Sequence, residues 1–508
     1  MKRILFCLFV FFSCEKTHAA DGDSIWGVNF IHDIHFNFSQ TSYWDTLVAN
    51  HNTDTYTSCE MIFDGTVLSS TAVRFKGNSS YNNPSQKKSL KVDLNEFVSG
   101  QDYDGIKKFN LNNGFKDPTF IREKLTLDYM RRHGIHAPRC TYARVYFNNV
   151  YWGLYMLVED VNSKFLSQHY GNNNGNLFKG DPQGDLRWYG STLSSYTSRY
   201  ELDQSSTNDW SDLVNLIDTI NNTGSSNYYN TLEEILFGQD AINNMVINNM
   251  FVNLDSYCGS GHNYYVYHDS LIGKFRWIPW DVNETFGNFN MGMTPVQLKD
   301  LAYDFIDQPN SRPLAVKMLA DPTYHQTYIY TYCYLMQDFN NAYLDPYIDS
   351  LANVIRTDVY ADTNKFYTDQ NFEDNLTMDI VVSGGPGGFN ILGLKNFITS
   401  RRASLETQLA SFGCYLAVEE PKTESAALSL FPNPVADVLF IEIPEWSNNE
   451  LFTYEILDVT GRVIETGTIS PNGEQSSLDV SEIAGGVYIL RVTNSRGTVL
   501  SSRFCRST

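Results

Sequence analysis

A polar segment near the end of the chain, AVEEPKTESAA at residues 417–427, separates two regions of different texture. It holds few large apolar side chains, which is typical of a linker. Before it, strand-like runs alternate with amphipathic helical stretches. After it, short strand-like runs follow one another. We therefore predict a large mixed domain at residues 25–414, a linker at 415–427 and a small all-β domain at 428–508.

Length and composition limit the kinds of protein that this chain can be. The 508 residues give room for two or three domains. Hydrophobic residues make up 42% and aromatic residues 14%, which excludes a disordered chain. A net charge of -21 leaves little positive field to attract a phosphate backbone, so we expect no nucleic-acid partner. The sequence holds no CxxC pair, which argues against structural zinc and a thioredoxin-like redox site.

The first twenty residues have the features of an export signal. Lys2 and Arg3 precede an apolar run at residues 4–12, and small residues end at Ala19 and Ala20. We predict a cleaved signal peptide at residues 1–20; a lipoprotein with lipid on Cys14 is the weaker alternative. No later segment reaches about 18 consecutive apolar residues, so no transmembrane span is expected. Export also permits disulfide bonds, whose pairing the spacing does not reveal.

The C-terminal region consists of six short strand-like runs separated by turn-forming residues. Regular short strands with such turns indicate a small β-sandwich. The runs lie at residues 438–443, 452–457, 462–466, 476–480, 487–492 and 499–504.

Three ordered motifs in this region carry a family resemblance. They are LFPNP at residues 430–434, DVTGRV at 458–463 and GVY at 486–488. The region resembles the type A C-terminal sorting domain of the Bacteroidetes type IX secretion system. This resemblance implies that the type IX machinery is a partner and that the protein is secreted or displayed on the cell surface. The closing residues RFCRST depart from the Lys-Phe-apolar-Lys ending of relatives.

The first part of the large domain predicts two hairpins around a helix. Residues 71–75 and 87–94 read as strands joined by a polar turn, and residues 120–133 as a helix that Gly134 ends. Residues 142–147 and 151–159 form a second hairpin through Asn148 and Asn149. The order strand, strand, helix, strand, strand is that of a kinase small lobe.

Residues 240–287 place polar side chains at both ends of one predicted hairpin. A helix at residues 241–252 leads to a loop with Asp255 and Asn263, and strands at 264–268 and 275–280 lead to Asp281. Antiparallel pairing returns the chain, so Asp281 should lie beside Asn263.

These residue types are the ones that phosphoryl transfer requires. An Asp accepts the proton of the substrate hydroxyl, and a carboxylate with an amide oxygen holds magnesium on the phosphates. An Asp at a strand end is more often a turn former or helix cap, so the pattern alone leaves both interpretations open.

Ordered motifs carry a second family resemblance, over about residues 30–412. The motifs are FKGNSS at 75–80, KKSLK at 87–91, REKL at 122–125, YWGLY at 151–155, VED at 158–160, GHNYY at 261–265, IPWD at 278–281, RPL at 312–314, DP at 321–322, LKNF at 394–397 and RR at 401–402. In this order they resemble the CotH kinase family. The resemblance implies an α+β, atypical protein-kinase-like two-lobed fold. It also implies a secreted or surface kinase that uses ATP with Mg²⁺ or Mn²⁺ to phosphorylate Ser or Thr of exported proteins.

The resemblance assigns roles to the polar residues of the predicted hairpin. Asp255 resembles the catalytic-loop Asp and Asp281 the metal-binding Asp. Asn263 is the expected second metal ligand, eight residues after Asp255 instead of five as in ordinary kinases.

Three further residues are expected to contact the nucleotide. Lys88 is the preferred phosphate-binding lysine, paired with Glu123 on the helix; Lys87 and Lys91 are rivals. Glu159 ends a strand where a nucleotide-contacting hinge would lie. The alternatives are a solvated strand-edge lysine for Lys88 and a surface or helix-capping carboxylate for Glu159.

Two other functions compete with an active kinase. Relatives commonly carry Asp-x-Asp where this chain has Asp281-Val282-Asn283, so an inactive surface binding protein or adhesin is the alternative. The second competing function is carbohydrate binding through aromatic side chains, namely Tyr264, Tyr265, Trp277 and Trp280. Packing in the core is the commoner explanation for such side chains. We interpret His262 as a hydrogen-bonding structural residue.

Overall fold

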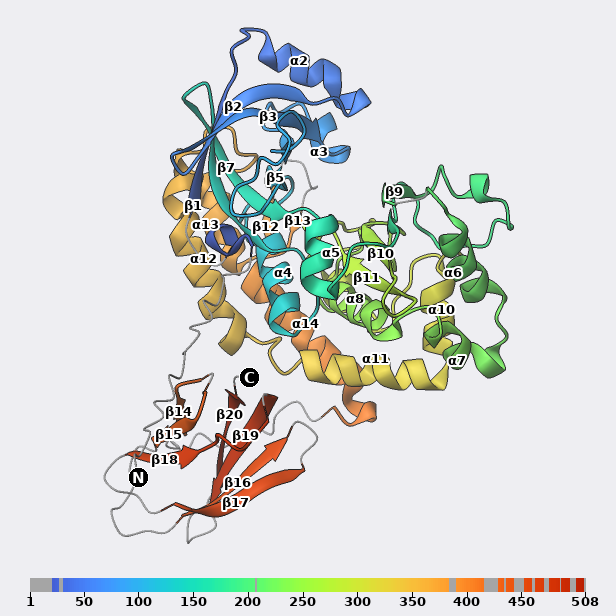
Figure 1. Cartoon of the computed structure of the whole chain (residues 1–508), viewed down its shortest axis with the longest axis vertical. Helices are drawn as coiled ribbons and strands as arrows, with labels where there is room; N and C mark the ends of the chain where they lie inside the picture. Colours follow the sequence, from blue (N-terminus) through green and yellow to red (C-terminus); the bar gives the residue numbers. More distant parts are fainter. Residues whose placement is uncertain are drawn as a thin grey trace, which may run out of the picture. The chain divides into compact units, whose positions relative to one another are not determined.

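In the computed structural model the chain divides into two compact units, Met1–Leu416 and Ala417–Thr508 (Figure 1). The predicted signal peptide and linker lie outside the residues that the structure describes. Those residues are 21–26, 31–205, 208–382, 390–414, 428–433, 435–442, 452–458, 462–469, 475–484, 486–493 and 499–506.

A closed barrel forms the first part of the larger unit. Its strands follow the order β1-β2-β3-β4-β5-β7-β6, and β1 closes it by pairing in parallel with β6. The strands are β1 (Ile31–Asn37), β2 (Thr57–Phe63), β3 (Thr66–Lys76), β4 (Ser89–Asp93), β5 (Lys108–Asn112), β6 (Cys140–Phe147) and β7 (Val150–Glu159).

Alternation along the strands decides which side chains fill the barrel. Val73, Phe75, Leu90 and Val92 point into its core. Because successive side chains of a strand face opposite sides, Lys76 and Lys91 lie on the outer face. Short helices flank the barrel: α1 (Asp23–Trp26), α2 (Tyr43–Asn50) with a 3₁₀ turn at His51–Thr53, and α3 (Ser79–Asn82).

The two predicted hairpins are confirmed. Strands β3 and β4 pair from Ala72↔Asp93 to Lys76↔Ser89. Strands β6 and β7 pair through the predicted turn, where Asn148 and Asn149 have φ angles of 48° and 66°. Two consecutive positive φ angles are what the tight turn of a β-hairpin requires, and Asn adopts them readily.

The predicted helix between the hairpins is α4 (Arg122–Arg132). Its predicted apolar positions Leu125, Tyr129 and Met130 are all buried. Glu123 lies in its first turn and two arginines in its last, which suits the helix dipole at both ends. Gly134 follows with a φ of 75°, as expected for a residue that stops a helix.

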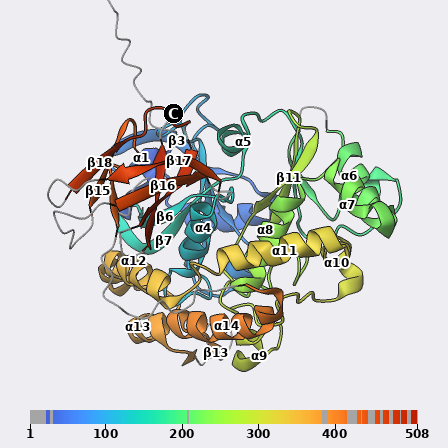
Figure 2. The same cartoon turned by 90° about the horizontal axis from the view of Figure 1, so that it is seen from below.

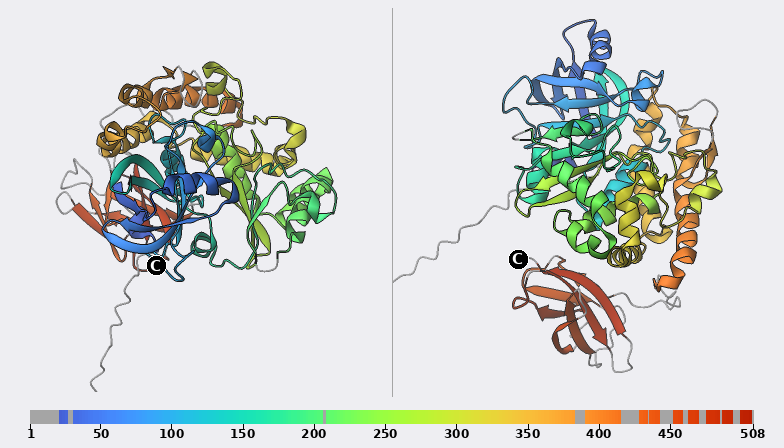
Figure 3. Two further views of the ribbon diagram at one scale, coloured as in Figure 1. Left: turned by 90° about the horizontal axis from the view of Figure 1, so that it is seen from above. Right: turned by 90° about the vertical axis from the view of Figure 1, so that its right-hand side faces the viewer.

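Helices around a small sheet form the second part of the larger unit, and Figure 3 shows the barrel strands and these helices at different ends of it. The sheet has the order β11-β10-β8-β9. Its strands are β8 (Leu177–Lys179), β9 (Glu201–Gln204), β10 (Tyr264–Asp269) and β11 (Lys274–Pro279). The helices are α5 (Ser163–Tyr170), α6 (Ser211–Asn222), α7 (Tyr228–Glu233), α8 (Gly238–Met250), α9 (Pro295–Lys299), α10 (Pro313–Ala320) and α11 (Pro322–Leu335).

The chain then returns toward the barrel through three packed helices (Figure 2). These are α12 (Asn341–Ala361), α13 (Asp369–Thr377) and α14 (Leu394–Leu409), with a two-stranded sheet of β12 (Ile380–Val381) and β13 (Asn390–Ile391). Helix α12 contacts β7 of the barrel. Short 3₁₀ turns lie at Leu193–Ser195, Ser225–Asn227, Pro309–Ser311 and Ala410–Phe412.

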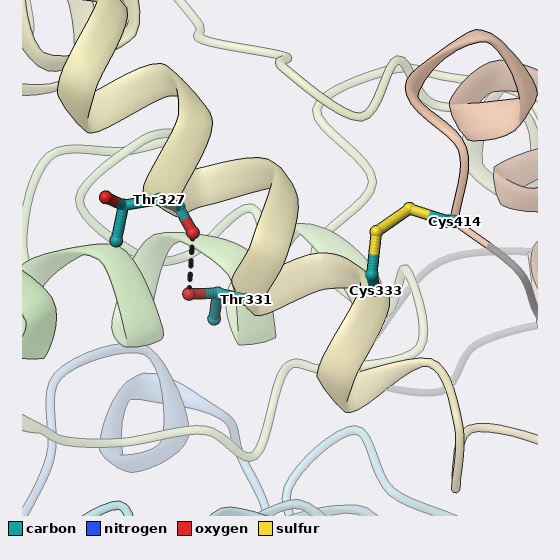
Figure 4. The surroundings of a disulfide bond; sticks show 4 residues. All are labelled: Thr327, Thr331, Cys333 and Cys414. Carbon is teal, nitrogen blue, oxygen red and sulfur yellow. Dashed lines mark hydrogen bonds between the residues drawn. A yellow bond between two sulfur atoms is a disulfide. The ribbon is translucent and has the colours of Figure 1, made fainter. Parts of the chain in front are cut away.

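A disulfide bond joins Cys333 in α11 to Cys414, 81 residues later (Figure 4). Near it, Thr331 Oγ1 donates to the carbonyl of Thr327 within the same helix, at 2.9 Å. Cys59 and Cys140 are buried free thiols in the two hydrophobic cores. The disulfide therefore fixes the last described residue of the larger unit to α11.

The smaller unit consists of strands, as predicted. One sheet has the order β14-β15-β18 and the other β17-β16-β19-β20, and side chains of both share one core. The strands are β14 (Ser429–Phe431), β15 (Val438–Glu442), β16 (Phe452–Asp458), β17 (Val463–Ile469), β18 (Gln475–Asp479), β19 (Gly486–Thr493) and β20 (Val499–Arg506). The α+β class with an all-β C-terminal unit is confirmed.

Within the described ranges, no helix combines the length and the apolar character that crossing a bilayer requires.

Candidate functional site

The hairpin of β10 and β11 has the register that brings its two ends together. Tyr264 pairs with Pro279, so Asn263 and Asp281 lie at the same end of the hairpin. Both have left-handed backbones, with φ angles of 63° and 50°. Left-handed non-glycine residues are uncommon and tend to cluster at functional sites, where the surrounding structure imposes the conformation.

Asn263 is held by Asp255 through its amide nitrogen. Its Nδ2 donates to the Asp255 carbonyl at 2.8 Å and to Asp255 Oδ2 at 3.1 Å. The side-chain oxygen of Asn263 remains as its acceptor, the atom with which an amide binds a cation. His262 Nε2 lies 3.4 Å from Asp255 Oδ1, so His262 contacts the same carboxylate.

Asp281 is close enough to Asp255 for their charges to interact. Desolvation raises the pKa of Asp281; the charge of Lys76 opposes this and that of Asp255 adds to it. The structure therefore brings Asp255, Asn263 and Asp281 into one neighbourhood, and it adds Lys76, which the sequence interpretation did not single out.

Lys76 is the last residue of β3 and reaches toward β5 on the outer face of the barrel. Its Nζ lies 3.1 Å from Asn110 Oδ1 and 3.2 Å from Asn112 Oδ1. Desolvation lowers the pKa of Lys76 to about 8, against the attraction of Asp281 and Glu123. It also lies 5.3 Å from the ring centroid of Trp280.

Glu123, in the first turn of α4, receives hydrogen bonds from Asn112. The amide nitrogen donates to both carboxylate oxygens, at 2.8 and 2.9 Å. Burial and the charge of Asp281 together raise the pKa of Glu123 to about 7. Asn112 thus connects the amine of Lys76 to the carboxylate of Glu123.

The structure places Lys88 elsewhere, which corrects the expected pairing with Glu123. Its Nζ donates to the carbonyls of Tyr81 and Asn83, both at 2.6 Å, and lies 4.9 Å from the centre of the Tyr81 ring. Lys88 precedes β4 and holds the β3–β4 loop, so its side chain serves that loop and not α4.

The two rival lysines have carboxylate partners of their own. Lys87 forms an ion pair with Asp362, and both side chains are fully buried. Lys91 lies 3.1 Å from Asp160, which also accepts from Asn110 Nδ2 at 3.0 Å.

Glu159 ends β7 but its carboxylate is taken up by Arg139. The two side chains interact twice, at 2.5 and 3.0 Å, and the Arg139 backbone N–H also donates to Glu159 at 3.0 Å. This buried arrangement differs from a surface or capping carboxylate. It positions the segment that follows β7. Glu159 is also among the residues that line the cavity described next, so its contact with a nucleotide stays a prediction.

A cavity of about 550 Å³ opens beside that segment. Lys91, Asp160, Val161, Leu177 and Asp203 are among its lining residues. Hydrogen bonds and an ion pair connect the cavity to the polar cluster, from Lys91 through Asp160 and Asn110 to Lys76. The volume lies within the usual range for small-molecule sites.

Glu284 is a further buried carboxylate that the sequence interpretation missed. Burial raises its pKa to about 7, and the charges of Asp255 and Asp281 add to the effect of burial. Lys116 Nζ lies 2.9 Å from Glu284 Oε1. Glu284 comes three residues after Asp281, and this spacing was the available signal.

The motif RPL at residues 312–314 stabilises the loop of Asp255. Arg312 is buried and donates to the Gly259 carbonyl at 2.5 Å. Gly261 has a φ of 96°, and a Cβ there would lie 2.7 Å from the Arg312 guanidinium carbon. Glycine is therefore required at this position.

The aromatic residues of the hairpin belong mainly to the core. Tyr264, Tyr265 and Trp277 are buried, and the rings of Tyr264 and Trp277 stack with centroids 4.0 Å apart. Tyr265 contacts Trp280 edge to face. Carbohydrate binding through these rings is therefore not supported, because their faces are already packed.

The donor set of the cluster fits a hard divalent cation bound together with a ligand that supplies further oxygens. Asp281 and Asn263 offer a carboxylate and an amide oxygen. Burial raises the pKa of Asp281 and the charge of Asp255 adds to this, and a bound cation would favour the ionised carboxylate against both effects. Among the described residues, no three His, Cys, Asp or Glu side chains form a metal-binding group on their own.

Comparisons with known proteins identify both units. Residues 73–405 match the family described as CotH kinase protein. Residues 429–504 match the secretion system C-terminal sorting domain, so the protein is secreted or displayed on the cell surface, as predicted, and the sorting domain implies handling by the type IX secretion machinery.

Curated relatives agree with this. The chain is 24% identical over 285 residues to inner spore coat protein H of Bacillus subtilis, covering 55% of this chain and 75% of that protein. It is 24% identical over 344 residues to invasin CotH2 of Rhizopus delemar, covering 61% of this chain and 56% of that protein. It is 30% identical over 115 residues to invasin CotH3 of the same organism, covering 21% and 19% of the two chains. Since the matched family region spans more than half of its length, the chain belongs to the CotH kinase protein family.

Proposed function

We propose that this chain is an atypical protein kinase that transfers the γ-phosphate of ATP to Ser or Thr of exported proteins. The observation that carries the proposal is the convergence of two connected pairs with Asp281. Lys76 of β3 and Glu123 of α4 are joined through Asn112. Asp255, in the loop before β10, is joined to Asn263, and Asp281 follows β11 close enough to interact with Lys76 and Asp255. These are the residue types that kinases use to hold and transfer a phosphoryl group.

The order of elements supports a kinase-like, two-lobed interpretation. Strands β3, β4, β5, β7 and β6 with α4 would form a small lobe, in which residues 77–88 join β3 to β4 as the loop over the phosphates. Helix α8, the Asp255 loop, the β10–β11 hairpin and Asp281 follow in the order of a kinase catalytic centre.

In this proposal ATP occupies the cavity lined by Lys91 and Asp160. Lys76 would hold the phosphates, in place of Lys88. Its amine is fixed by Asn110 and Asn112, and Asn112 is fixed in turn by Glu123. An ordinary kinase achieves the same with a direct Lys–Glu pair. Glu159 would act indirectly, by positioning the hinge through Arg139.

Asp255 would accept the proton of the substrate hydroxyl as the phosphoryl group moves. Asn263 donates to Asp255 Oδ2 and so orients this carboxylate. Asp281 and the Asn263 side-chain oxygen would hold Mg²⁺ or Mn²⁺, which neutralises phosphate charge when bound. Arg312 would keep the loop in place through Gly259.

A surface binding protein without turnover is the second candidate. It is favoured by Asn283, an amide at the position where the family resemblance leads us to expect a carboxylate, and by the name invasin that two relatives carry. Such a protein would keep the kinase-like architecture and bind a partner at the surface.

The test is phosphate transfer from γ-labelled ATP by the purified chain with Mg²⁺ or Mn²⁺, using secreted proteins of the same organism as acceptors. Asp255→Asn and Asp281→Asn should each abolish transfer. Of the two, only Asp281→Asn should also remove the metal-dependent thermal shift that ATP produces. Unchanged transfer in both variants would reject the assigned roles. A thermal shift without transfer in the native chain would favour the binding protein.

A further inference from the structure

A second concavity of about 550 Å³ lies on the barrel, between α2 and strands β2 and β3. It shares no lining residue with the cavity beside Asp160. Hydroxyl and amide side chains dominate its lining, with Glu60 as the one carboxylate and Tyr56 as the one aromatic ring. Among its described lining residues there is no Lys or Arg. We call this concavity the β2 groove.

The backbone under the β2 groove is irregular. The pairing of β2 with β3 shifts register between Cys59 and Met61, so Glu60 lies opposite the two residues Ser69 and Ser70. Ser70 has a φ of 49°, in the left-handed region. A β-bulge of this kind re-aims side chains and is common beside binding sites. A serine in this conformation within a strand indicates that the shape of the groove is maintained at a cost.

One wall of the β2 groove holds an acceptor that the protein itself does not use. Asn37 Nδ2 donates to Glu60 Oε1 at 3.2 Å. Asn37 Oδ1 is buried and has no hydrogen-bond partner within the described part of the chain. An unpaired buried acceptor is unfavourable, so a ligand that donates a hydrogen bond there would be stabilised. Glu60 is exposed and offers further acceptor capacity beside it.

We propose that the β2 groove binds a neutral carbohydrate chain. Anionic ligands are disfavoured because the lining offers Glu60 and no cation. Apolar ligands are disfavoured because the lining is mostly polar. A sugar presents adjacent hydroxyls that donate to Asn37 Oδ1 and Glu60, and that accept from serine and threonine hydroxyls such as those of Ser58 and Ser69. The site is independent of the proposed phosphate transfer.

Saturation-transfer NMR with the purified full chain tests this proposal, using maltoheptaose, cellopentaose and chitopentaose as probes and spermidine as a cationic probe. We expect millimolar binding of at least one oligosaccharide and none of spermidine. Ser69→Tyr should fill the groove and abolish the signal. Val67→Tyr is the matched control, since Val67 is 58% exposed on the same strand but outside the groove lining.

A second variant keeps the test decisive if Ser69→Tyr disturbs the bulge. Glu60→Ala removes an exposed acceptor together with its hydrogen bond from Asn37. Because that bond is solvent-exposed, the variant should weaken oligosaccharide binding while changing the melting temperature little. Three outcomes overturn the proposal: no oligosaccharide signal at millimolar concentration, a signal in both Ser69→Tyr and Glu60→Ala that equals that of the native chain, or binding of spermidine alone.

Discussion

Lys76 and Glu123 are connected through one asparagine: Asn112 accepts from Lys76 Nζ at 3.2 Å and donates to Glu123 at 2.8 Å. The lysine comes from β3 and the glutamate from α4, while the asparagine lies on β5 between them. An amide can do this because it carries both an acceptor oxygen and a donor nitrogen. The connection therefore makes the orientation of the amine depend on the position of the helix.

Replacing Lys76 separates the two assignments of the phosphate-binding lysine. Lys76→Met should abolish the thermal shift that ATP and Mg²⁺ produce and lower phosphate transfer by roughly 10²–10³-fold, a usual loss for one preorganised electrostatic contact. Lys88→Met is the control, since Lys88 binds carbonyls of its own loop. The reverse outcome would restore Lys88 as the phosphate-binding residue.

Glu123 should make the stability of the protein depend on pH. Burial raises its pKa to about 7, above the value of 4.5 for an unperturbed side chain. Between these values the folded protein holds a proton that the unfolded chain has released, so stability falls as pH rises through this window. The side chain of Glu123→Gln does not titrate. The free energy of unfolding of this variant should therefore rise, relative to that of the native chain, by about 2–3 kcal/mol between about pH 4.5 and pH 7. Urea unfolding of both proteins at about pH 4.5 and about pH 7 measures this. The same difference in unfolding free energy at both pH values would refute it.

Substitutions of Lys87 and Asp362 should have strongly non-additive effects on the free energy of unfolding, because the two side chains form an ion pair and are fully buried. Lys87→Met leaves a buried carboxylate without its cation and should cost about 3–5 kcal/mol. Asp362 also accepts from the backbone N–H groups of Leu154 and Asn364, at 3.0 and 2.9 Å, so Asp362→Ala should cost more. The double variant should be less destabilised than the two single losses combined, as a double-mutant cycle with urea measures. Additive losses would mean that the pair does not act as a unit.

Removing the disulfide should destabilise the larger unit and leave the smaller one unchanged. Cys333→Ser with Cys414→Ser should cost about 2–4 kcal/mol, because the bond closes a loop of 81 residues. Calorimetry with and without reductant measures this, and the double variant should no longer respond to reductant. Cys505→Ser is the control, since Cys505 is a free thiol in the smaller unit.

The sequence predicted best those features that depend on local pattern. The Asn148-Asn149 turn, the helix stopped by Gly134 and the hairpin that brings Asn263 to Asp281 all follow from residues close together in the chain. Each of these depends on turn chemistry or on strand pairing between neighbours.

Features that depend on distant pairing could not be predicted. The role of Lys76 depends on the pairing of β5 with β4 and β7, since its partners Asn110 and Asn112 lie more than thirty residues away in the chain. Arg139 and Glu159 meet because β6 and β7 are paired, and nothing in the spacing distinguishes this from a free hinge carboxylate. Lys88 stands outside the regular part of β4, where alternation does not determine direction.

Cys414 is the last described residue before the segment that leads to the sorting domain, and it is covalently bound to Cys333 of α11. A force applied to the residues after Cys414 would therefore reach α11 through the disulfide as well as α14 through the backbone. The point at which the sorting domain is attached is thus coupled to two helices of the larger unit.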